Sequence, residues 1–229
     1  HLHEDHIGGL DDVINNFNII SLYLPNDTST TKTYEDVLMA IYEKDLTIKH
    51  SKKGIVIFND TINGKLLKAE MLSPIQNSYS NANDYSPVIK LTYDEATFLF
   101  TGDAEKLVED ELLDDDVDLR ADVLKVGHHG SSSSSSAAFV QAVSPKISII
   151  SVGKDNKYGH PSDAVIKRLI SNGSLVYRTD KDGTIVVKSN GNIYDVLTND
   201  NTLTYHNNYG ETLVVNDEKR KYLGWIYVG

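Results

Sequence analysis

The chain opens with His1-Leu2-His3-Glu4-Asp5-His6, followed by Ile7-Gly8-Gly9-Leu10, and this stretch decides the interpretation of the rest. Imidazole and carboxylate groups in the order His-x-His-x-Asp-His suit Zn²⁺ and also accommodate Mn²⁺ or Fe. The two histidines one residue apart can converge on one ion, and the adjacent Asp-His pair points to a second ion nearby. Paired ions can produce a hydroxide nucleophile near neutral pH and stabilise an in-line displacement. The alternatives are a solvated polar stretch or a purification tag, but a tag does not interleave aspartate or continue into Ile-Gly-Gly.

Three later segments carry further candidate ligands, each at the end of an apolar run. Thr97–Phe100 leads into Asp103, Ala121–Val126 leads into His128 and His129, and Ile149–Val152 leads into a loop that contains His160. Burying an isolated carboxylate is costly, so Asp103 is predicted to bridge two cations. The strand ends are expected to open on one edge of a sheet, which would gather these side chains.

Other elements follow from local signals. Apolar spacing predicts a short helix over 10–17, and Thr33 is the expected N-cap of a helix over 34–44. Strands are expected around an Asn63-Gly64 turn. The six serines at 131–136 are compatible with a flexible linker, but we interpret them as a loop and N-cap region that enters a helix over 137–143.

Together, the motifs resemble the metallo-β-lactamase fold superfamily, and within it the hydrolase domain of ComEC-type competence proteins. The resemblance covers roughly residues 1–195. It implies an α/β fold of four layers, an αββα sandwich with the metals at one sheet edge. Relatives place a β-hairpin region before the His-x-His-x-Asp-His motif, so the N-terminal strands of the fold are expected to be missing from this sequence.

The resemblance also implies two divalent metal ions, most simply Zn²⁺, with Mn²⁺ or Fe as alternatives. Many superfamily members have a further histidine in the loop after Leu72, where this sequence has Asn83 and Ser86. The first ion is therefore expected to have fewer protein ligands and to bind more weakly. The second ion is expected at Asp5, His6, Asp103 and His129. The full set of predicted ligands is His1, His3, Asp5, His6, Asp103 and His129.

The predicted catalytic residues are Asp5, His128 and His160. His160 is a candidate proton donor to the leaving group, and the competing interpretation is a loop histidine that caps the next helix. His128 would contact the substrate or support the metal ligands from outside. An ordinary Asx-turn loop explains Asn83 and Ser86 equally well. Weak candidates for substrate contact are Asn83, Ser86, Ser131, Lys154 and Asn156.

Composition narrows the possible functions. The chain has 229 residues, 40% of them hydrophobic, and no cysteine, which excludes disulfides, thiolate metal sites and a cysteine nucleophile. Its net charge of −11 repels polyanions unless a local basic groove or the metals offset it. No apolar run is long enough to span a bilayer and no signal peptide is visible, so a cytoplasmic and an extracellular location both stay open.

We therefore expect a hydrolase domain over residues 1–197 and a β-rich extension of unassigned role over 198–229. The expected chemistry is hydrolysis by a metal-bridging hydroxide, with a phosphodiester as the first substrate class and a nuclease-like activity included. One alternative is hydrolysis of another ester, a lactone, an amide or a small phosphoester such as phosphorylcholine. The other is a metal-binding interaction module without catalytic activity. Nucleic acid is a candidate partner that the acidic charge disfavours, and the sequence identifies no protein partner.

Overall fold

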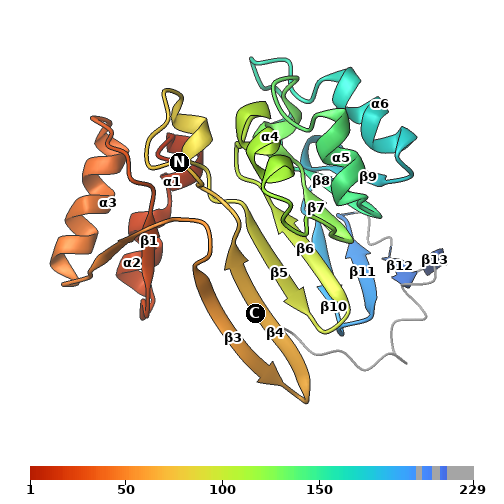
Figure 1. The fold of residues 1–229 in the computed structure, drawn as a ribbon, viewed down its shortest axis with the longest axis horizontal. Helices are drawn as coiled ribbons and strands as arrows, with labels where there is room; N and C mark the ends of the chain where they lie inside the picture. The colour runs from red at the N-terminus through yellow and green to blue at the C-terminus, as the bar shows by residue number, and fades with distance from the viewer. Residues whose placement is uncertain (200–202, 208–211, 216–229) are drawn as a thin grey trace.

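The computed structural model describes residues 1–199, 203–207 and 212–215. Its largest sheet has seven strands in the order β3-β4-β5-β6-β7-β8-β9 (Figure 1). Neighbours from β3 to β6 are antiparallel, and those from β6 to β9 are parallel. The strands are β3 (Val56–Ile62), β4 (Lys65–Met71), β5 (Ile89–Tyr93), β6 (Ala96–Phe100), β7 (Val123–Lys125), β8 (Ile147–Ile150) and β9 (Leu175–Arg178).

The connections between strands differ between the antiparallel and the parallel part of this sheet. Asn63 and Gly64 both have positive φ, of 54° and 78°, which confirms the predicted tight turn between β3 and β4. Parallel strands need longer crossovers, and helices supply them. The crossover helices are α4 (Lys106–Asp114), α5 (Ala137–Val143) and α6 (Asp163–Ser171).

Side chains along the parallel strands point alternately to the two faces of the sheet, and both faces are covered. Leu99, Leu124 and Ile150 pack in the core with α4, α5 and α6, which cover one face (Figure 1). Phe98 and Val123 point the other way and pack against a second sheet. This mixed α/β architecture confirms the predicted fold of the metallo-β-lactamase type, and the helix–sheet–sheet order gives three of the four layers of the predicted αββα sandwich. The second sheet is antiparallel and consists of β10 (Val186–Ser189), β11 (Ile193–Leu197), β12 (Leu203–Asn207) and β13 (Thr212–Val215).

The second sheet crosses the expected domain boundary. Its third strand, β12, pairs with β11 from Ile193↔Asn207 to Leu197↔Leu203. Strands on both sides of residue 197 thus share one hydrogen-bonded ladder. The division into 1–197 and 198–229 stays a prediction, and residues 200–202, 208–211 and 216–229 lie outside the described part of the chain.

The N-terminal elements form a hydrophobic cluster of their own, which includes Ile14, Val37 and Ile41. The N-cap of α3 is Thr31, whose hydroxyl accepts the Tyr34 N–H, so the prediction of Thr33 was wrong. Thr33 lies inside the first turn, because the helix begins two residues earlier than its apolar spacing indicated. Among the described residues, no helix is long and apolar enough to cross a bilayer. These elements are α1 (Glu4–Ile7), α2 (Leu10–Asn16), α3 (Lys32–Glu43), β1 (Leu22–Leu24) and β2 (Ile48–His50).

The serine-rich segment is an ordered loop that enters α5. Ser136 caps this helix by accepting the Phe139 N–H, and the buried Glu109 carboxylate of α4 accepts the backbone N–H groups of Ser135 and Ser136. Burial raises the pKa of Glu109, while these hydrogen bonds favour its charged form. A carboxylate therefore fixes the loop that follows the His128-His129 pair.

Replacing Glu109 by Ala should destabilise the fold, because two buried backbone N–H groups would lose their acceptor. We expect the free energy of unfolding to fall by about 2–4 kcal/mol, measured by urea denaturation. The matched control is Asp110→Ala on the exposed side of the same helix, which should stay within roughly 0.5 kcal/mol of the parent. Equal losses in the two variants would contradict this role of Glu109.

Candidate metal centre

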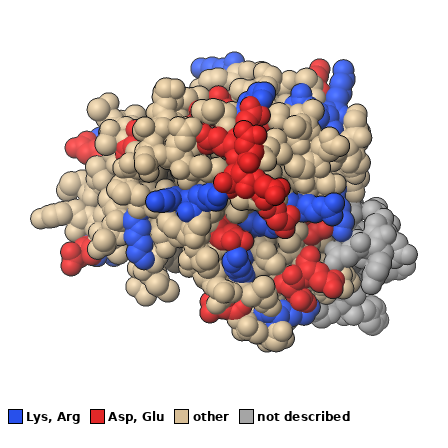
Figure 2. Space-filling view, viewed as in Figure 1, with Lys and Arg blue, Asp and Glu red and all other residues tan. Residues whose placement is uncertain are grey.

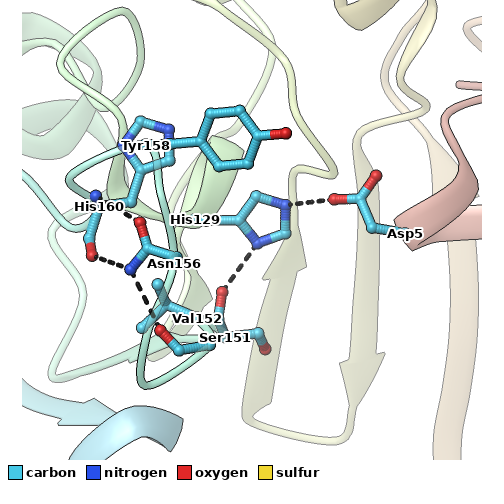
Figure 3. A pocket seen from close by; sticks show the side chains of 8 residues that line it. Asp5, His129, Ser151, Val152, Asn156, Tyr158 and His160 are labelled. Carbon is cyan, nitrogen blue, oxygen red and sulfur yellow. Dashed lines mark hydrogen bonds and ion pairs between the residues drawn. The ribbon is translucent and has the colours of Figure 1, made fainter.

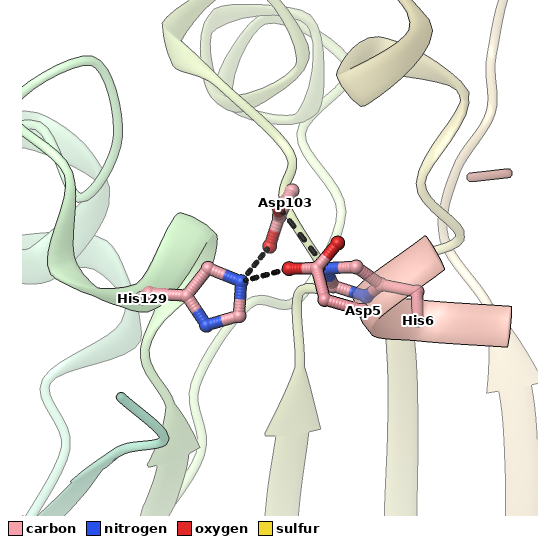
Figure 4. A group of neighbouring side chains, drawn as sticks. All are labelled: Asp5, His6, Asp103 and His129. Carbon is pink, nitrogen blue, oxygen red and sulfur yellow. Dashed lines mark hydrogen bonds and ion pairs between the residues drawn. The ribbon is translucent and has the colours of Figure 1, made fainter. Parts of the chain in front are cut away.

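Asp103 lies at the centre of the site, where the chain turns after β6. Its side chain is buried, and its Oδ2 lies 3.1 Å from His6 Nε2 and 3.6 Å from His1 Nε2. Its Oδ1 lies 3.6 Å from His129 Nε2 (Figure 4). Burial alone would raise the pKa of Asp103, but the hydrogen bond from His6 and the charges of the surrounding histidines lower it below its ordinary value. The carboxylate is therefore held in its ionised, metal-binding form.

Parallel strands deliver these groups to one sheet edge. Asp103 follows β6, and His128 and His129 follow β7 in the short 3₁₀ turn η2 (Gly127–Gly130). Ser151 follows β8, and the chain continues from it to His160. Because β6, β7 and β8 run parallel, their carboxyl ends meet, as the sequence predicted.

Four side chains form a compact ligand set: one ligand atom each from Asp5, His6, Asp103 and His129 lies within 4.8 Å of the others. Asp5 Oδ2 is 3.1 Å from His129 Nε2 and 3.6 Å from His6 Nε2. Two ligand atoms about 2.1 Å from a tetrahedral zinc are roughly 3.4 Å apart. The distances in this group therefore match those between atoms that share one ion, and the four residues are those predicted for the second ion.

The residues predicted for the first ion form a less compact group than those predicted for the second. His1 is buried, and its ring lies 4.1 Å from that of His6 between centroids. Its Nε2 is buried and has no hydrogen-bond partner among the described residues. His3 is solvent-exposed at the start of α1, with its ring centroid 4.5 Å from that of His1. The structure thus places His1 against Asp103 and His3 beside His1.

The His128-His129 pair has an unusual backbone. Both residues have positive φ, of 46° and 53°, a conformation that costs energy for residues other than glycine and is found at functional sites. Gly130 follows with φ of 80°, and a Cβ there would lie 2.5 Å from the Cβ of Pro161. This turn therefore packs directly against the residue after His160, and only glycine fits the approach.

Hydrogen bonds at Nδ1 orient the two imidazoles. His129 Nδ1 donates to the Ser151 carbonyl at 2.8 Å, since a carbonyl can only accept. His128 Nδ1 lies 3.1 Å from Glu105 Oε1, and its Nε2 lies 3.9 Å from Asp103 Oδ2. In the neutral form, each ring then presents an Nε2 lone pair to the Asp103 side. Such outer partners commonly fix the tautomer of metal-binding histidines.

Glu105 is the residue that the sequence analysis missed. Besides His128, its carboxylate accepts hydrogen bonds from Asn81 Nδ2 at 3.0 Å, Asn83 Nδ2 at 3.1 Å and Ser133 Oγ at 3.1 Å. The available signal was its position two residues after Asp103, at the N-cap of α4. Glu105 connects the loop before β5, the turn after β7 and the serine-rich loop.

A pocket of about 310 Å³ opens beside the metal ligands (Figure 3). Asp5 and His129 line it on the metal side, and Tyr158 and His160 line it on the other, with their rings stacked at 5.9 Å. Asn156 accepts the His160 N–H at 2.9 Å and donates to the His160 carbonyl at 2.7 Å. The structure therefore brings His160 to the pocket and shows Asn156 bracing the loop that carries it. Substrate contact by Asn156 stays a prediction.

The other weak candidates for substrate contact differ in position. Asn83 and Ser86 are buried beside the metal ligands, where Asn83 contacts Glu105 and Ser86 contacts His1. Ser131 is buried, and its hydroxyl lies 3.0 Å from that of Ser133. Lys154 is exposed and lines a neighbouring hollow next to Asp180 and Asp182. Their roles toward a substrate remain predictions.

The residues present fit a divalent metal. Imidazole and carboxylate form the donor set of zinc and manganese sites. Buried polar atoms are normally hydrogen-bonded, yet His1 Nε2 and Asp103 Oδ1 are buried, unpartnered and directed at the same cluster. Cations held in this cluster would satisfy both atoms.

Comparison with known proteins agrees with this geometry. A profile of the metallo-beta-lactamase superfamily matches residues 1–154, which include the opening motif, Asp103, His128 and His129. The chain belongs to this superfamily, a class of metal-dependent hydrolases that share the sandwich fold.

Within the superfamily, the similar proteins include competence proteins, as the resemblance implied. ComE operon protein 3 of Bacillus subtilis is 35% identical over 185 residues, which cover 81% of this chain and 23% of the relative. Competence protein ComA of Neisseria gonorrhoeae is 37% identical over 51% of this chain and 17% of its own length. Recombination protein 2 of Haemophilus influenzae is 35% identical over 53% of this chain and 15% of its own length. The chain therefore spans less than a quarter of each of these relatives.

Added divalent metal should stabilise the folded protein, because it binds the assembled ligands and not the unfolded chain. At a metal concentration 100 times the Kd, the gain is about 2.7 kcal/mol. For a chain of this size that corresponds to roughly 5–11 °C in Tm, measured by thermal denaturation with and without chelator. Asp103→Asn should remove the shift, and Asp116→Asn, in an exposed turn, should keep it. An unchanged shift in Asp103→Asn would refute the site.

Proposed function

We propose that this chain is a divalent-metal-dependent phosphodiester hydrolase with two metal sites around Asp103. The observation that carries the proposal is the convergence of Asp5, His6, Asp103 and His129 within 4.8 Å at the end of the parallel strands. The two oxygens of Asp103 face different imidazoles: Oδ1 faces His129, and Oδ2 faces His1 and lies nearest to His6, which is placed between the two proposed sites. This carboxylate is thus suited to hold two ions at once.

Each side of the cluster has its own proposed ligands. His1, His3 and Asp103 would hold the first ion, while Asp5, His6, Asp103 and His129 would hold the second. Zinc suits this donor set best, and manganese or iron is the alternative. Bound ions of this kind supply a nucleophile near neutral pH and offset the negative charge that develops on the phosphoryl group.

The chain's own residues then position the substrate and move protons. The pocket beside His129 would hold the leaving group against Tyr158 and His160, which line its far wall. His160 is the proposed proton donor to the leaving oxygen. His128 lies between His129 and His160, with its ring centroid 5.6 Å from that of His160, and would contact the substrate from its Nε2. Asp5 would act as a ligand and as an acceptor of protons at the pocket rim.

Two arguments favour a phosphodiester. Paired metal ions bind the oxygens of one phosphoryl group from both sides, which suits in-line displacement. Two of the relatives are named for competence and for recombination, and recombination acts on nucleic acids, whose backbone is a phosphodiester.

The charge distribution favours short substrates. Figure 2 shows acidic side chains gathered over α4 and the turn after it, with basic side chains scattered around them. Short substrates that reach the metals alone fit this surface better than long duplexes.

Asp103→Ala should abolish hydrolysis of bis-p-nitrophenyl phosphate, because it removes the carboxylate shared by both sites. We expect kcat/KM to fall by more than the roughly 10–100-fold typical of losing an outer partner of a metal ligand. The assay follows p-nitrophenolate release from metal-loaded protein, in parallel with single-stranded DNA and a lactone.

The same screen separates the alternatives. If the protein hydrolyses the lactone or a carboxylic ester but no phosphodiester, the alternative of a hydrolase for other esters replaces the proposal. Metal binding without turnover of any substrate would indicate a non-catalytic interaction module. Activity that survives Asp103→Ala would contradict the proposed mechanism outright.

His160→Ala should show the signature of a lost proton donor. The loss in kcat should reach about 10²-fold or more for an alkyl leaving group, which needs a proton, and should be much smaller for p-nitrophenolate. Burial, together with repulsion from His128 and His129, lowers the pKa of His160 below its ordinary value of 6.5. The protonated form is lost as pH rises through that lowered pKa, so kcat/KM for the alkyl substrate should fall as pH rises, with its midpoint below 6.5.

The control for this experiment is His50→Ala, which removes an exposed histidine that lies outside the pocket. It should leave both substrates and the pH profile unchanged. Equal losses for both leaving groups in His160→Ala would show that His160 does not donate the proton.

A further inference from the structure

Ser86 lies at the junction of two proposed metal ligands. It is fully buried directly after the 3₁₀ turn η1 (Ala82–Tyr85), and its Oγ is 3.0 Å from His1 Nδ1 and 3.0 Å from the backbone N of Asp103. Gly102 packs against it so closely that an added Cβ would lie 3.0 Å from the Ser86 Cβ. One hydroxyl therefore bridges His1 and Asp103, which lie far apart in the sequence.

Counting protons leaves two arrangements for this hydroxyl. The Asp103 backbone N–H can only donate, so it takes one lone pair of Oγ. Toward His1, Oγ either accepts from Nδ1–H with its second lone pair or donates its own proton to a bare Nδ1. The first arrangement leaves Nε2 of the neutral His1 ring with a lone pair, and the second puts the proton on Nε2.

Each arrangement leaves one buried proton without an acceptor among these groups, the Ser86 hydroxyl proton in the first and the His1 Nε2 proton in the second, and a cation at His1 Nε2 selects the first. This atom is buried without a hydrogen-bond partner among the described residues, and the nearest carboxylate oxygen, Asp103 Oδ2, is 3.6 Å away. A proton there would be a buried donor with no acceptor in hydrogen-bond range, which is costly. A lone pair there, beside an ionised carboxylate, is the arrangement that a metal ion requires. His129 and His128 are oriented in the same way, with Nδ1 on an acceptor and Nε2 toward Asp103.

We propose that Ser86 is a positioning residue for the first metal site. Its hydroxyl oxygen accepts from both His1 Nδ1–H and the Asp103 backbone N–H, and so directs His1 Nε2 and the Asp103 carboxylate toward one ion. This inference rests on the proposed function and assigns Ser86 a role outside the substrate contacts. Many superfamily members have a further histidine in this loop. In this chain the shorter Ser86 side chain would instead orient His1 and Asp103.

The test is metal binding to the full chain, measured by competition with a chromophoric chelator for zinc. Ser86→Ala should weaken one of the two binding steps by roughly 10–100-fold and leave the other within about twofold. Ser148→Ala is the matched control, because Ser148 is equally buried and hydrogen-bonded to Ser174 but far from the ligands in the β8–β9 part of the sheet.

A second readout does not depend on any variant folding. Long-range ¹H–¹⁵N NMR of the zinc-loaded wild-type protein should show a proton on His1 Nδ1 and no proton on its Nε2. The inference is overturned if His1 is protonated at Nε2, or if Ser86→Ala binds two zinc ions as tightly as the wild type. Wild-type protein that binds no zinc would overturn the proposed function as well, so the two failures are distinguishable.

Discussion

The structure depends on one buried carboxylate. Asp103 lies almost fully buried at the end of a central strand, and an ionised group there is costly without compensation. Histidine nitrogens approach both of its oxygens, His6 and His1 at Oδ2 and His129 at Oδ1. These imidazoles offset the burial of the carboxylate, and a cation held among them would also pair with the buried His1 Nε2.

The sandwich fold brings Asp103 and the surrounding histidines together. Parallel strands β6, β7 and β8 end at the same edge, so segments that follow Phe100, Lys125 and Ile150 meet there. The opening motif comes from the N-terminal cluster and supplies the remaining ligands. Each ring has a partner at Nδ1: the Ser151 carbonyl for His129, Glu105 for His128 and Ser86 for His1. The strand ends and these hydrogen bonds thus arrange the proposed ligands without any ion or substrate bound.

The sequence predicted the fold and the cluster of Asp5, His6, Asp103 and His129, because ligand types and strand ends are encoded locally and the motif order identified the superfamily. It could not predict which atoms fix the ligands. Glu105 follows Asp103 by two residues with no motif to mark it, and its contacts with Asn81, Asn83 and Ser133 come from segments far apart in sequence. Thr31 rather than Thr33 caps α3, because the helix begins two residues before the start that its apolar spacing indicated.

The central claim is that Asp103 is shared by two metal ions. Anomalous diffraction from crystals of the full chain grown with zinc, recorded on both sides of the zinc absorption edge, tests it most directly. The account predicts two peaks about 3.5–4 Å apart, one within bonding distance of Asp103 and His129 and the other within bonding distance of Asp103 and His1. Peaks located elsewhere, or no peak beside Asp103 at saturating zinc, would contradict it.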